Sequence, residues 1–320
     1  MGFQSGQTGQ GAKNFSIESI RLDLTSACNQ ACVFCPFNIS GVHSDGVRHL
    51  AAAQITKVLG SLRSMNIKVK FRLVGMGEPT IHPDFLKVSR MIVEEEHSLK
   101  MITNGLFSGN LVNSISGVFQ EVVFSIHGPP ATHDWATGVK GSFSRAMNNI
   151  ERLRKNDSAV SILMNAVCSR ETVDDLPQLV KIAFDMNIKL RIQFVLDESG
   201  IDYSTEEVEK ILSVVERIMA DTTDSIFVPN LAVQEIPTYF NFSKSHFRTP
   251  FVCKQYTKEL CIACDGEVSL CRFPRIGNIT NRSLESILES KRLQDVVGLL
   301  NRVAMSEISI PKECSRCCMN

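Results

Sequence analysis

The 320-residue sequence has no net charge, because 34 lysines and arginines balance 34 aspartates and glutamates. A chain without an overall positive field is not expected to bind nucleic acid or an anionic membrane surface. The sequence also lacks the run of about 20 apolar residues that a membrane-spanning helix needs. Its first twenty residues lack the apolar centre of a secretory signal. We therefore expect a cytoplasmic protein that binds neither membranes nor nucleic acids.

Cysteine, in contrast, is abundant, with eleven residues in the chain. In a reducing compartment so many cysteines indicate metal binding or catalysis more than disulfides, and an odd number cannot pair completely. Three lie close together near the start, one lies mid-chain, and seven lie in the last seventy residues. This distribution predicts two separate cysteine sites.

Short segments rich in apolar and β-branched residues alternate with longer amphipathic segments over much of the chain. Six strands are predicted, at 20–25, 70–75, 99–105, 121–128, 161–167 and 189–196. Strand and helix alternating every thirty residues or so are typical of βα units around a parallel sheet. Six units are too few for an eight-unit barrel, so we expect an α/β fold with either a partial barrel or a doubly wound sheet. In both, the ligand site lies at the carboxyl ends of the strands.

The first cysteine group directly follows the first predicted strand and reads CxxxCxxC, formed by Cys28, Cys32 and Cys35. Three thiolates on one short loop are one fewer than a closed iron–sulfur cluster takes, which would leave one iron open to a substrate or cofactor. The alternative is a zinc site that takes a fourth ligand from elsewhere, such as His43.

With Phe34 at its aromatic position, this loop resembles the CxxxCxΦC motif of the radical SAM superfamily. Residues 75–79 (GMGEP) resemble the family's GGEP element, and residues 103–105 (TNG) follow at the end of the third strand. The run that begins SIHGPP at Ser125 is similar to the family's SIDGP run. The resemblance covers roughly residues 18–200 and implies a partial (β/α)6 barrel that binds S-adenosylmethionine (SAM) and a 4Fe–4S cluster.

The resemblance also implies roles for individual residues. The three cysteines would hold the cluster, Glu78 and the backbone at Gly77 would bind the ammonium group of SAM, and Phe34 would pack on adenine. The implied cofactor-binding residues are Phe34, Gly75, Gly77, Glu78, Pro79, Asn104, Ser125, Asn165 and Gln193. An isolated Asn or Ser at a strand end is as often a turn or cap residue.

The second cysteine set resembles the Twitch form of the SPASM auxiliary-cluster domain. Cys253 precedes a probable hairpin at Gly266, Cys271 follows that glycine by the expected spacing, and Cys314 and Cys317 form a CxxC pair. Four such cysteines close a second 4Fe–4S cluster, and we expect one auxiliary cluster. Cys261, Cys264 and Cys318 remain unassigned and could exchange with these ligands. A zinc-ribbon-like tail is the alternative.

These boundaries divide the chain into a disordered leader at 1–15, a radical SAM barrel at 16–225, a connecting segment at 226–249 and a Twitch domain at 250–320. Within the superfamily, the loop CNQACVFCPF resembles that of the aminocyclitol (2-deoxy-scyllo-inosamine) dehydrogenases. That resemblance implies oxidation of a secondary alcohol on an aminocyclitol or sugar-like natural-product intermediate, with the auxiliary cluster as electron acceptor. Arg272 and Arg275 are candidates to bind or deprotonate the substrate.

Three alternatives remain open. A radical epimerase would use Cys261 or Cys264, or to a lesser degree Cys168, as hydrogen donor. A maturase would act on a ribosomally made peptide, and a non-catalytic iron–sulfur or zinc scaffold would catalyse no reaction. The expected partners of an enzyme are a small-molecule substrate, or a peptide, and an electron donor such as flavodoxin or ferredoxin.

Overall fold

The computed structural model describes residues 16–39, 46–195, 203–221, 225–228, 233–240, 258–270 and 274–304. Within them, one ten-stranded sheet has the order β10-β9-β8-β1-β2-β3-β4-β5-β6-β7. The parallel strands of its main part are β1 (Ser19–Leu22), β2 (Lys70–Leu73), β3 (Ser98–Thr103), β4 (Glu121–Ser125), β5 (Ser161–Cys168), β6 (Lys189–Phe194) and β7 (Ser225–Val228). The expected α/β fold, with a parallel sheet that does not close into a full barrel, is confirmed.

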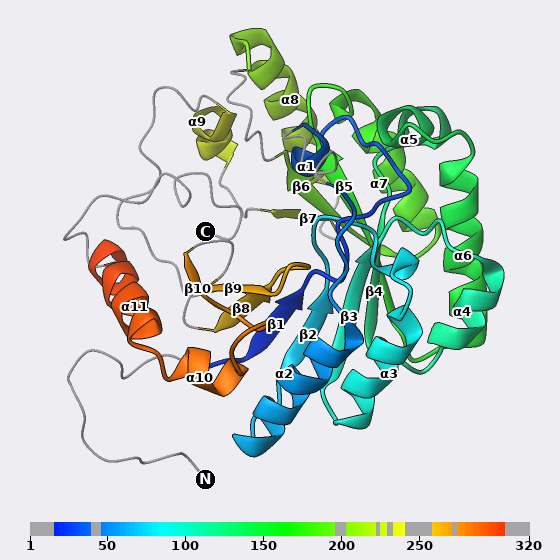
Figure 1. The fold of residues 1–320 in the computed structure, drawn as a ribbon. Helices are drawn as coiled ribbons and strands as arrows, with labels where there is room; N and C mark the ends of the chain where they lie inside the picture. The colour runs from blue at the N-terminus through cyan, green and yellow to red at the C-terminus, as the bar shows by residue number, and fades with distance from the viewer. Residues whose placement is uncertain are drawn as a thin grey trace.

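Helices cover the outer side of this sheet, as Figure 1 shows for α2, α3, α4 and α6. The helices of this region are α1 (Pro36–Ile39), α2 (Ala52–Ser64), α3 (Phe85–Glu94), α4 (Gly109–Ile115), α5 (Pro130–Thr137), α6 (Ser142–Asn156), α7 (Leu176–Asp185), α8 (Thr205–Asp221) and α9 (Ile236–Phe240), with 3-10 turns η2 (Pro79–Ile81), η3 (Val173–Asp175) and η4 (Val233–Glu235). Strand and helix side chains such as Ile20, Phe71, Ile55 and Val88 are all but fully buried between the layers. The core therefore lies on the helix-covered face, and the other face is left to form the site.

The sequence missed strand β7, which lies at the junction with the predicted connecting segment. It pairs in parallel with β6, and Phe227 stacks on Phe194 of β6 at 5.8 Å between ring centroids. Tyr239 and Phe240 of α9 pack on the same phenylalanine. Part of the segment predicted as a connection thus covers the end of the sheet. The predicted boundaries at 225 and 249 remain predictions.

The carboxyl-terminal region joins the same sheet. Strand β8 (Glu259–Ile262) pairs in parallel with β1, and β9 (Glu267–Leu270) and β10 (Arg275–Asn278) follow it antiparallel. The predicted hairpin is confirmed, with Gly266 at φ +82° in its turn. Two helices follow the hairpin, α10 (Leu284–Leu288) and α11 (Lys291–Ala304). They are separate because Ser290 Oγ accepts from the backbone N–H of Leu293 and starts a new helix.

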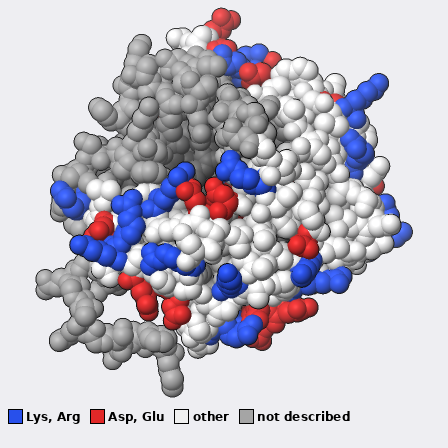
Figure 2. Space-filling view, in the orientation of Figure 1, with Lys and Arg blue, Asp and Glu red and all other residues white. Residues whose placement is uncertain are grey.

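Charged side chains lie on the uncovered face of the sheet, below the strand ends. Arg72 pairs with Glu259 across β1, Lys100 pairs with Glu121 at 3.2 Å, and Arg21 pairs with Asp23 at 3.3 Å. On the outer surface seen in Figure 2, acidic and basic side chains are interspersed. None of the helices within the described ranges is both long and apolar enough to cross a membrane.

The Arg72–Glu259 pair predicts a stability effect, because it ties the auxiliary hairpin to the main sheet. The Glu259 side chain is 7% exposed and that of Arg72 is 36% exposed. We expect Glu259→Ala to lower the free energy of unfolding by about 2 kcal/mol, between the effects of breaking exposed and buried pairs. Anaerobic urea unfolding measures this value.

A matched control is Lys68→Ala, which removes an exposed pair with Glu96 and should change stability by roughly 0.5 kcal/mol or less. The double change Arg72→Met with Glu259→Leu should recover most of the lost stability, because neither charge is then left alone. A double variant as unstable as Glu259→Ala would contradict the ion-pair explanation.

Candidate active site

One pocket of about 270 Å³ lies at the carboxyl ends of β2 to β6. The predicted residues that line it are Cys28, Cys32, Phe34, Cys35, Gly75, Gly77, Glu78, Asn104, Ser125, Asn165 and Gln193. Pro79 does not line the pocket and is instead buried at the start of η2. The structure thus brings together side chains that are separated by up to 165 residues in the sequence, at the edge where parallel strands converge.

The cysteine loop, residues 27–35, follows β1 and is held from outside by α5. The backbone N–H of Ala31 donates to the carbonyl of Thr137, and that of Val33 donates to the carbonyl of Ala136, both at 3.0 Å. Cys28 is exposed, whereas Cys32 and Cys35 are half-buried. The loop is therefore fixed by backbone contacts rather than by its cysteines alone.

The chemistry of the three thiols suits an iron–sulfur cluster. Although Cys28 is exposed as a whole residue, protein atoms displace water from its thiol and raise its pKa to about 11, with added repulsion from Glu78 and Cys35. Burial raises the pKa of Cys32 to about 12, with added repulsion from Cys28 and Cys35. Bound iron would supply the compensating positive charge. Within the described ranges, no three His, Cys, Asp or Glu side chains are placed around a single metal ion, whereas a four-iron cluster accepts more widely spaced thiolates.

The GMGEP turn needs both of its glycines because other groups lie against them. A β-carbon at residue 77 would overlap the backbone carbonyl oxygens of Ala27 and Thr25, and one at residue 75 would overlap the carboxylate of Asp23. The N–H of Glu78 donates to the same Ala27 carbonyl at 2.8 Å. The turn and the cysteine loop are thus in direct backbone contact.

The Glu78 carboxylate is buried, at 3% exposure, and already accepts several hydrogen bonds. Oε1 accepts from Thr80 N, Thr80 Oγ1 and Thr103 Oγ1 at 2.7 to 3.1 Å, and Oε2 accepts from Asn104 N at 2.7 Å. Burial raises the pKa of Glu78, while these donors act against the rise. Glu78 therefore ties the end of β2 to the end of β3, and its contact with an ammonium group remains a prediction.

The polar residues at the strand ends fall into two groups. Asn104 donates to Asn29 Oδ1 at 2.6 Å and accepts from Leu106 N at 2.9 Å, and Asn165 accepts from Arg191 Nε at 2.6 Å. These side chains also hold the structure together. Ser125 and Gln193 make no side-chain hydrogen bond within the described ranges, which leaves them available to a ligand.

Several lining residues were not among the predicted cofactor-binding residues, and two of them, Gln30 and His127, have side chains that can hydrogen-bond a ligand. Gln30 lies in the cysteine loop, and its Nε2 is buried without a hydrogen-bond partner in the described part of the chain. His127 follows β4, with its ring edge-on to Phe34 at 4.6 Å between centroids. The sequence signalled His127 only by its place beyond a strand end, and Gln30 only by its place between the cysteines.

The remaining predicted residues do not line this pocket. Cys261 lies on β8 and Cys264 in the following turn. The Cys264 thiol is 2% exposed, and burial together with the nearby carboxylates of Asp23 and Asp265 raises its pKa to about 11. Arg275 pairs with Glu267 at 2.8 Å and is 74% exposed. Six predicted residues lie outside the described ranges: His43, Cys253, Cys271, Arg272, Cys314 and Cys317.

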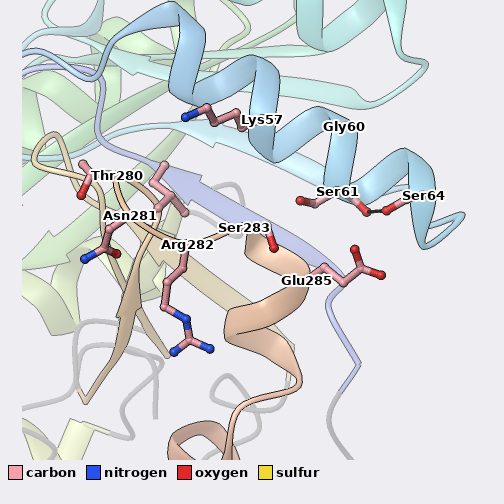
Figure 3. A pocket seen from close by; sticks show the side chains of 10 residues that line it. Lys57, Gly60, Ser61, Ser64, Thr280, Asn281, Arg282, Ser283 and Glu285 are labelled. Atoms are coloured by element: carbon pink, nitrogen blue, oxygen red, sulfur yellow. Dashed lines mark hydrogen bonds between the residues drawn. The ribbon is translucent and has the colours of Figure 1, made fainter.

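A larger hollow, of about 470 Å³, lies between α2 and the segment leading into α10 (Figure 3). Lys57, Ser61 and Ser64 line it from α2, with Arg282 and Glu285 on the opposite side. The Arg282 guanidinium donates a hydrogen bond to the backbone carbonyl oxygen of Ser286 in α10, at 2.7 Å. No lining residue is shared with the cysteine pocket, so the chemistry predicted from the sequence belongs to the smaller pocket.

Comparison with known families agrees with this geometry. The profile described as Radical SAM superfamily matches residues 22–183, which is half of the chain. The chain belongs to the radical SAM superfamily. A second profile, described as an iron–sulfur cluster-binding domain of the SPASM type, matches residues 253–318. The cofactors of this radical SAM chain are accordingly SAM, a 4Fe–4S cluster and, with the SPASM-type domain, auxiliary iron–sulfur binding.

Among curated relatives, a mycofactocin maturase MftC of Mycolicibacterium smegmatis is 28% identical over 172 residues, covering 53% of this chain and 42% of the relative. The chain thus spans less than half the length of that maturase. A probable GTP 3',8-cyclase of Sulfurisphaera tokodaii is 22% identical over 274 residues, covering 81% of this chain and 82% of the relative.

Solved radical SAM structures have the same fold at low identity. Streptococcus suis SuiB bound to the precursor peptide SuiA has a TM-score of 0.66 at 14% identity, covering 89% of this chain and 67% of SuiB. Native anSMEcpe with bound AdoMet has a TM-score of 0.64 at 19% identity, covering 93% of this chain and 86% of anSMEcpe. BtrN in complex with AdoMet and 2-DOIA matches at a TM-score of 0.49 and 12% identity.

The close approach at residue 77 predicts that Gly77→Ala moves the cysteine loop. We expect SAM cleavage to slow about 100-fold, because a displacement of about 1 Å has that effect on positioned reactants. The rate of 5'-deoxyadenosine formation measures the change, and the iron content shows whether the cluster is still loaded. Gly60→Ala is the control, since a β-carbon at that exposed position of α2 meets no atom within 4 Å. Equal rates in the two variants would refute the steric argument.

His127 and His133 predict a loss of stability in acid. Burial lowers the pKa of His127 to about 3 and that of His133 to about 4, whereas the ordinary value is 6.5. Between these values the unfolded chain binds more protons, so stability is complete above about pH 6.5 and is lost as the pH falls. Each histidine lowers the free energy of unfolding by about 1.4 kcal/mol for each unit by which the pH falls in this range.

The variant that tests this effect is His133→Asn, whose amide oxygen can replace Nδ1 as acceptor for the His127 N–H, now donated at 3.1 Å. It should match the original protein near pH 7.5 and lose less stability at pH 5.5, because one titrating group is gone. Thermal unfolding midpoints at the two pH values measure both. An unchanged slope would show that other groups control acid stability.

Proposed function

We propose that this chain is a radical SAM oxidoreductase that removes a hydrogen atom from an unactivated carbon, most specifically from the carbinol carbon of an aminocyclitol or sugar-like intermediate. The observation that carries the proposal is the shared pocket of the cysteine loop, the GMGEP turn and the polar strand ends. The hairpin of the auxiliary-cluster domain is hydrogen-bonded to β1, the strand that leads into that loop. This arrangement supports two iron–sulfur centres in one catalytic unit.

With cluster and SAM bound, the site supplies a 5'-deoxyadenosyl radical. Cys28, Cys32 and Cys35 would hold three irons and leave the fourth open, and Ser125 and Gln193 would orient the ligands. Oxidation of a secondary alcohol removes a hydrogen atom, a proton and an electron. The hydrogen atom leaves carbon and yields 5'-deoxyadenosine, and the electron goes to the auxiliary cluster. The proton leaves oxygen for solvent water, and Arg272 is the predicted group that binds this oxygen, since a guanidinium is already protonated. The product is a ketone.

The lining of the pocket supports a hydroxylated substrate. Among the described lining residues Glu78 carries the only carboxylate and no lysine or arginine is present, and that carboxylate is occupied by Thr80, Thr103 and Asn104. Ile102, Val167 and Val195 supply apolar walls that exclude water. Such a site recognises a ligand by hydrogen bonds rather than by charge. The external reductant is proposed to be a flavodoxin or ferredoxin.

Epimerisation is the second candidate, and Cys264 is the observation that favours it. A hydrogen-atom donor must keep its S–H bond, and the raised pKa of this buried thiol keeps it protonated at neutral pH. The thiol lies near Asp23, whose carboxylate packs on Gly75 of the pocket. Peptide modification is a third candidate, supported by likeness to the mycofactocin maturases and to SuiB with its precursor peptide.

The radical chemistry is tested by anaerobic reconstitution with iron and sulfide, followed by reduction in the presence of SAM. We expect 5'-deoxyadenosine from the original chain and none from the variant in which Cys28, Cys32 and Cys35 are all alanine. Cys168→Ala is the matched control, because this cysteine is fully buried in the core on the helix side. A purified chain that holds zinc and produces no 5'-deoxyadenosine would support the scaffold alternative.

Deuterium distinguishes the reactions. A dehydrogenase yields a product two mass units lighter and takes no solvent deuterium into carbon, whereas an epimerase yields an isomer with one solvent deuterium delivered by a thiol. If epimerisation is correct, Cys264→Ala should abolish deuterium incorporation, while Cys168→Ala should not. Candidate aminocyclitols and peptides are compared as substrates by mass spectrometry. Solvent deuterium at the reacting carbon would refute the dehydrogenase proposal.

A further inference from the structure

His127 has a backbone-capping role on one side of its ring. In the β4–β5 ladder, Ile126 N donates to Asn165 O at 2.9 Å, and the next position on β5 is Val167. The chain leaves the ladder after β4, and the N–H of Val167 donates instead to His127 Nδ1 at 3.3 Å. The imidazole therefore replaces the next carbonyl of the strand.

This contact fixes the tautomer of His127. Since Nδ1 accepts a hydrogen bond, the neutral ring carries its proton on Nε2. Burial lowers the pKa of the ring to about 3, so it stays neutral at physiological pH. Nε2 is consequently a hydrogen-bond donor without charge.

The donor faces the pocket. Nε2 of His127 makes no hydrogen bond in the described part of the chain, but the atom is accessible. Nε2 of the stacked His133, in contrast, is both buried and without a hydrogen bond there. His127 itself is 4% exposed and lines the pocket. The small accessible surface of the ring therefore opens where a ligand would lie.

Its position points to one part of SAM. The ammonium group of SAM is predicted to bind at Glu78 and the backbone of Gly77, which follow β2, whereas His127 lies beyond β4 and beside β5. Its ring is edge-on to Phe34, at 74° between ring planes, and Ser125 and Asn165 line the same side. We propose that His127 binds the adenosine portion of SAM through a hydrogen bond donated by Nε2.

Two isosteric variants separate the functions of the ring nitrogens. In His127→Asn the amide oxygen can occupy the place of Nδ1 and cap Val167, but no donor reaches the place of Nε2. In His127→Gln the amide nitrogen reaches the place of Nε2, but the cap is lost. The readouts are the thermal midpoint and the dissociation constant of SAM for the reconstituted, unreduced protein, measured by equilibrium dialysis with labelled SAM.

We expect His127→Asn to retain its midpoint and bind SAM about fivefold to tenfold more weakly, the effect of one hydrogen bond. We expect His127→Gln to melt lower and to retain most of its SAM affinity. Equal loss of SAM affinity in both variants would show that His127 is only a structural cap. Unchanged SAM affinity in His127→Asn would refute the proposal, even if the KM of the substrate rises in that variant.

The inference rests on the proposed radical chemistry only in requiring that SAM binds. The original protein tests that requirement separately, because a chain that does not bind SAM at all would refute the proposed function before any variant is compared. SAM and S-adenosylhomocysteine, which share the adenosine portion, should lose affinity equally in His127→Asn. A loss confined to SAM would place the contact at the sulfonium and overturn the assignment.

Discussion

The site depends on the absence of a side chain at residue 77. Because the backbone there lies directly against the carbonyl oxygen of Ala27, the turn after β2 and the loop after β1 have a single relative position. The hydrogen bond from Glu78 N to the same carbonyl fixes the contact. Packed backbone deforms much less than side chains do, so three cysteines on an otherwise irregular loop acquire a defined geometry before any metal binds.

Glu78 extends this order from two strands to three. Its buried carboxylate accepts from Thr103 and Asn104 at the end of β3, and Asn104 in turn holds Asn29 of the cysteine loop. Burying a carboxylate is unfavourable unless donors compensate it, and four of them do so here. The residue that the motif suggests as a ligand contact is therefore first a structural link, and a ligand would have to share it.

Much of the fold was predictable because the signals are local. Strands were recognised from runs of β-branched residues, and the cysteines, GMGEP and Ser125 all follow strands whose ends must meet. Strand β7 was missed because Ser225–Val228 is short and precedes a proline-rich stretch. The β8–β1 pairing was missed because partners 240 residues apart leave no periodic signal. The role of His127 depends on where β4 leaves the ladder, which only the three-dimensional register defines.

The charges of the uncovered sheet face explain why the pocket above them is neutral. Three cations of the sheet have a carboxylate near them, since Arg72 has Glu259, Lys100 has Glu121 and Arg21 has Asp23, and Arg191 donates to the amide oxygen of Asn165. Paired charges at short range produce little field a few ångströms away, where the pocket offers hydroxyl, amide and imidazole N–H groups. Such groups discriminate ligands by geometry, since a buried donor left unpaired by the wrong ligand lowers its affinity. Selection among hydroxylated ligands, or among positions of a peptide, then depends on how many of these donors and acceptors a ligand satisfies at once.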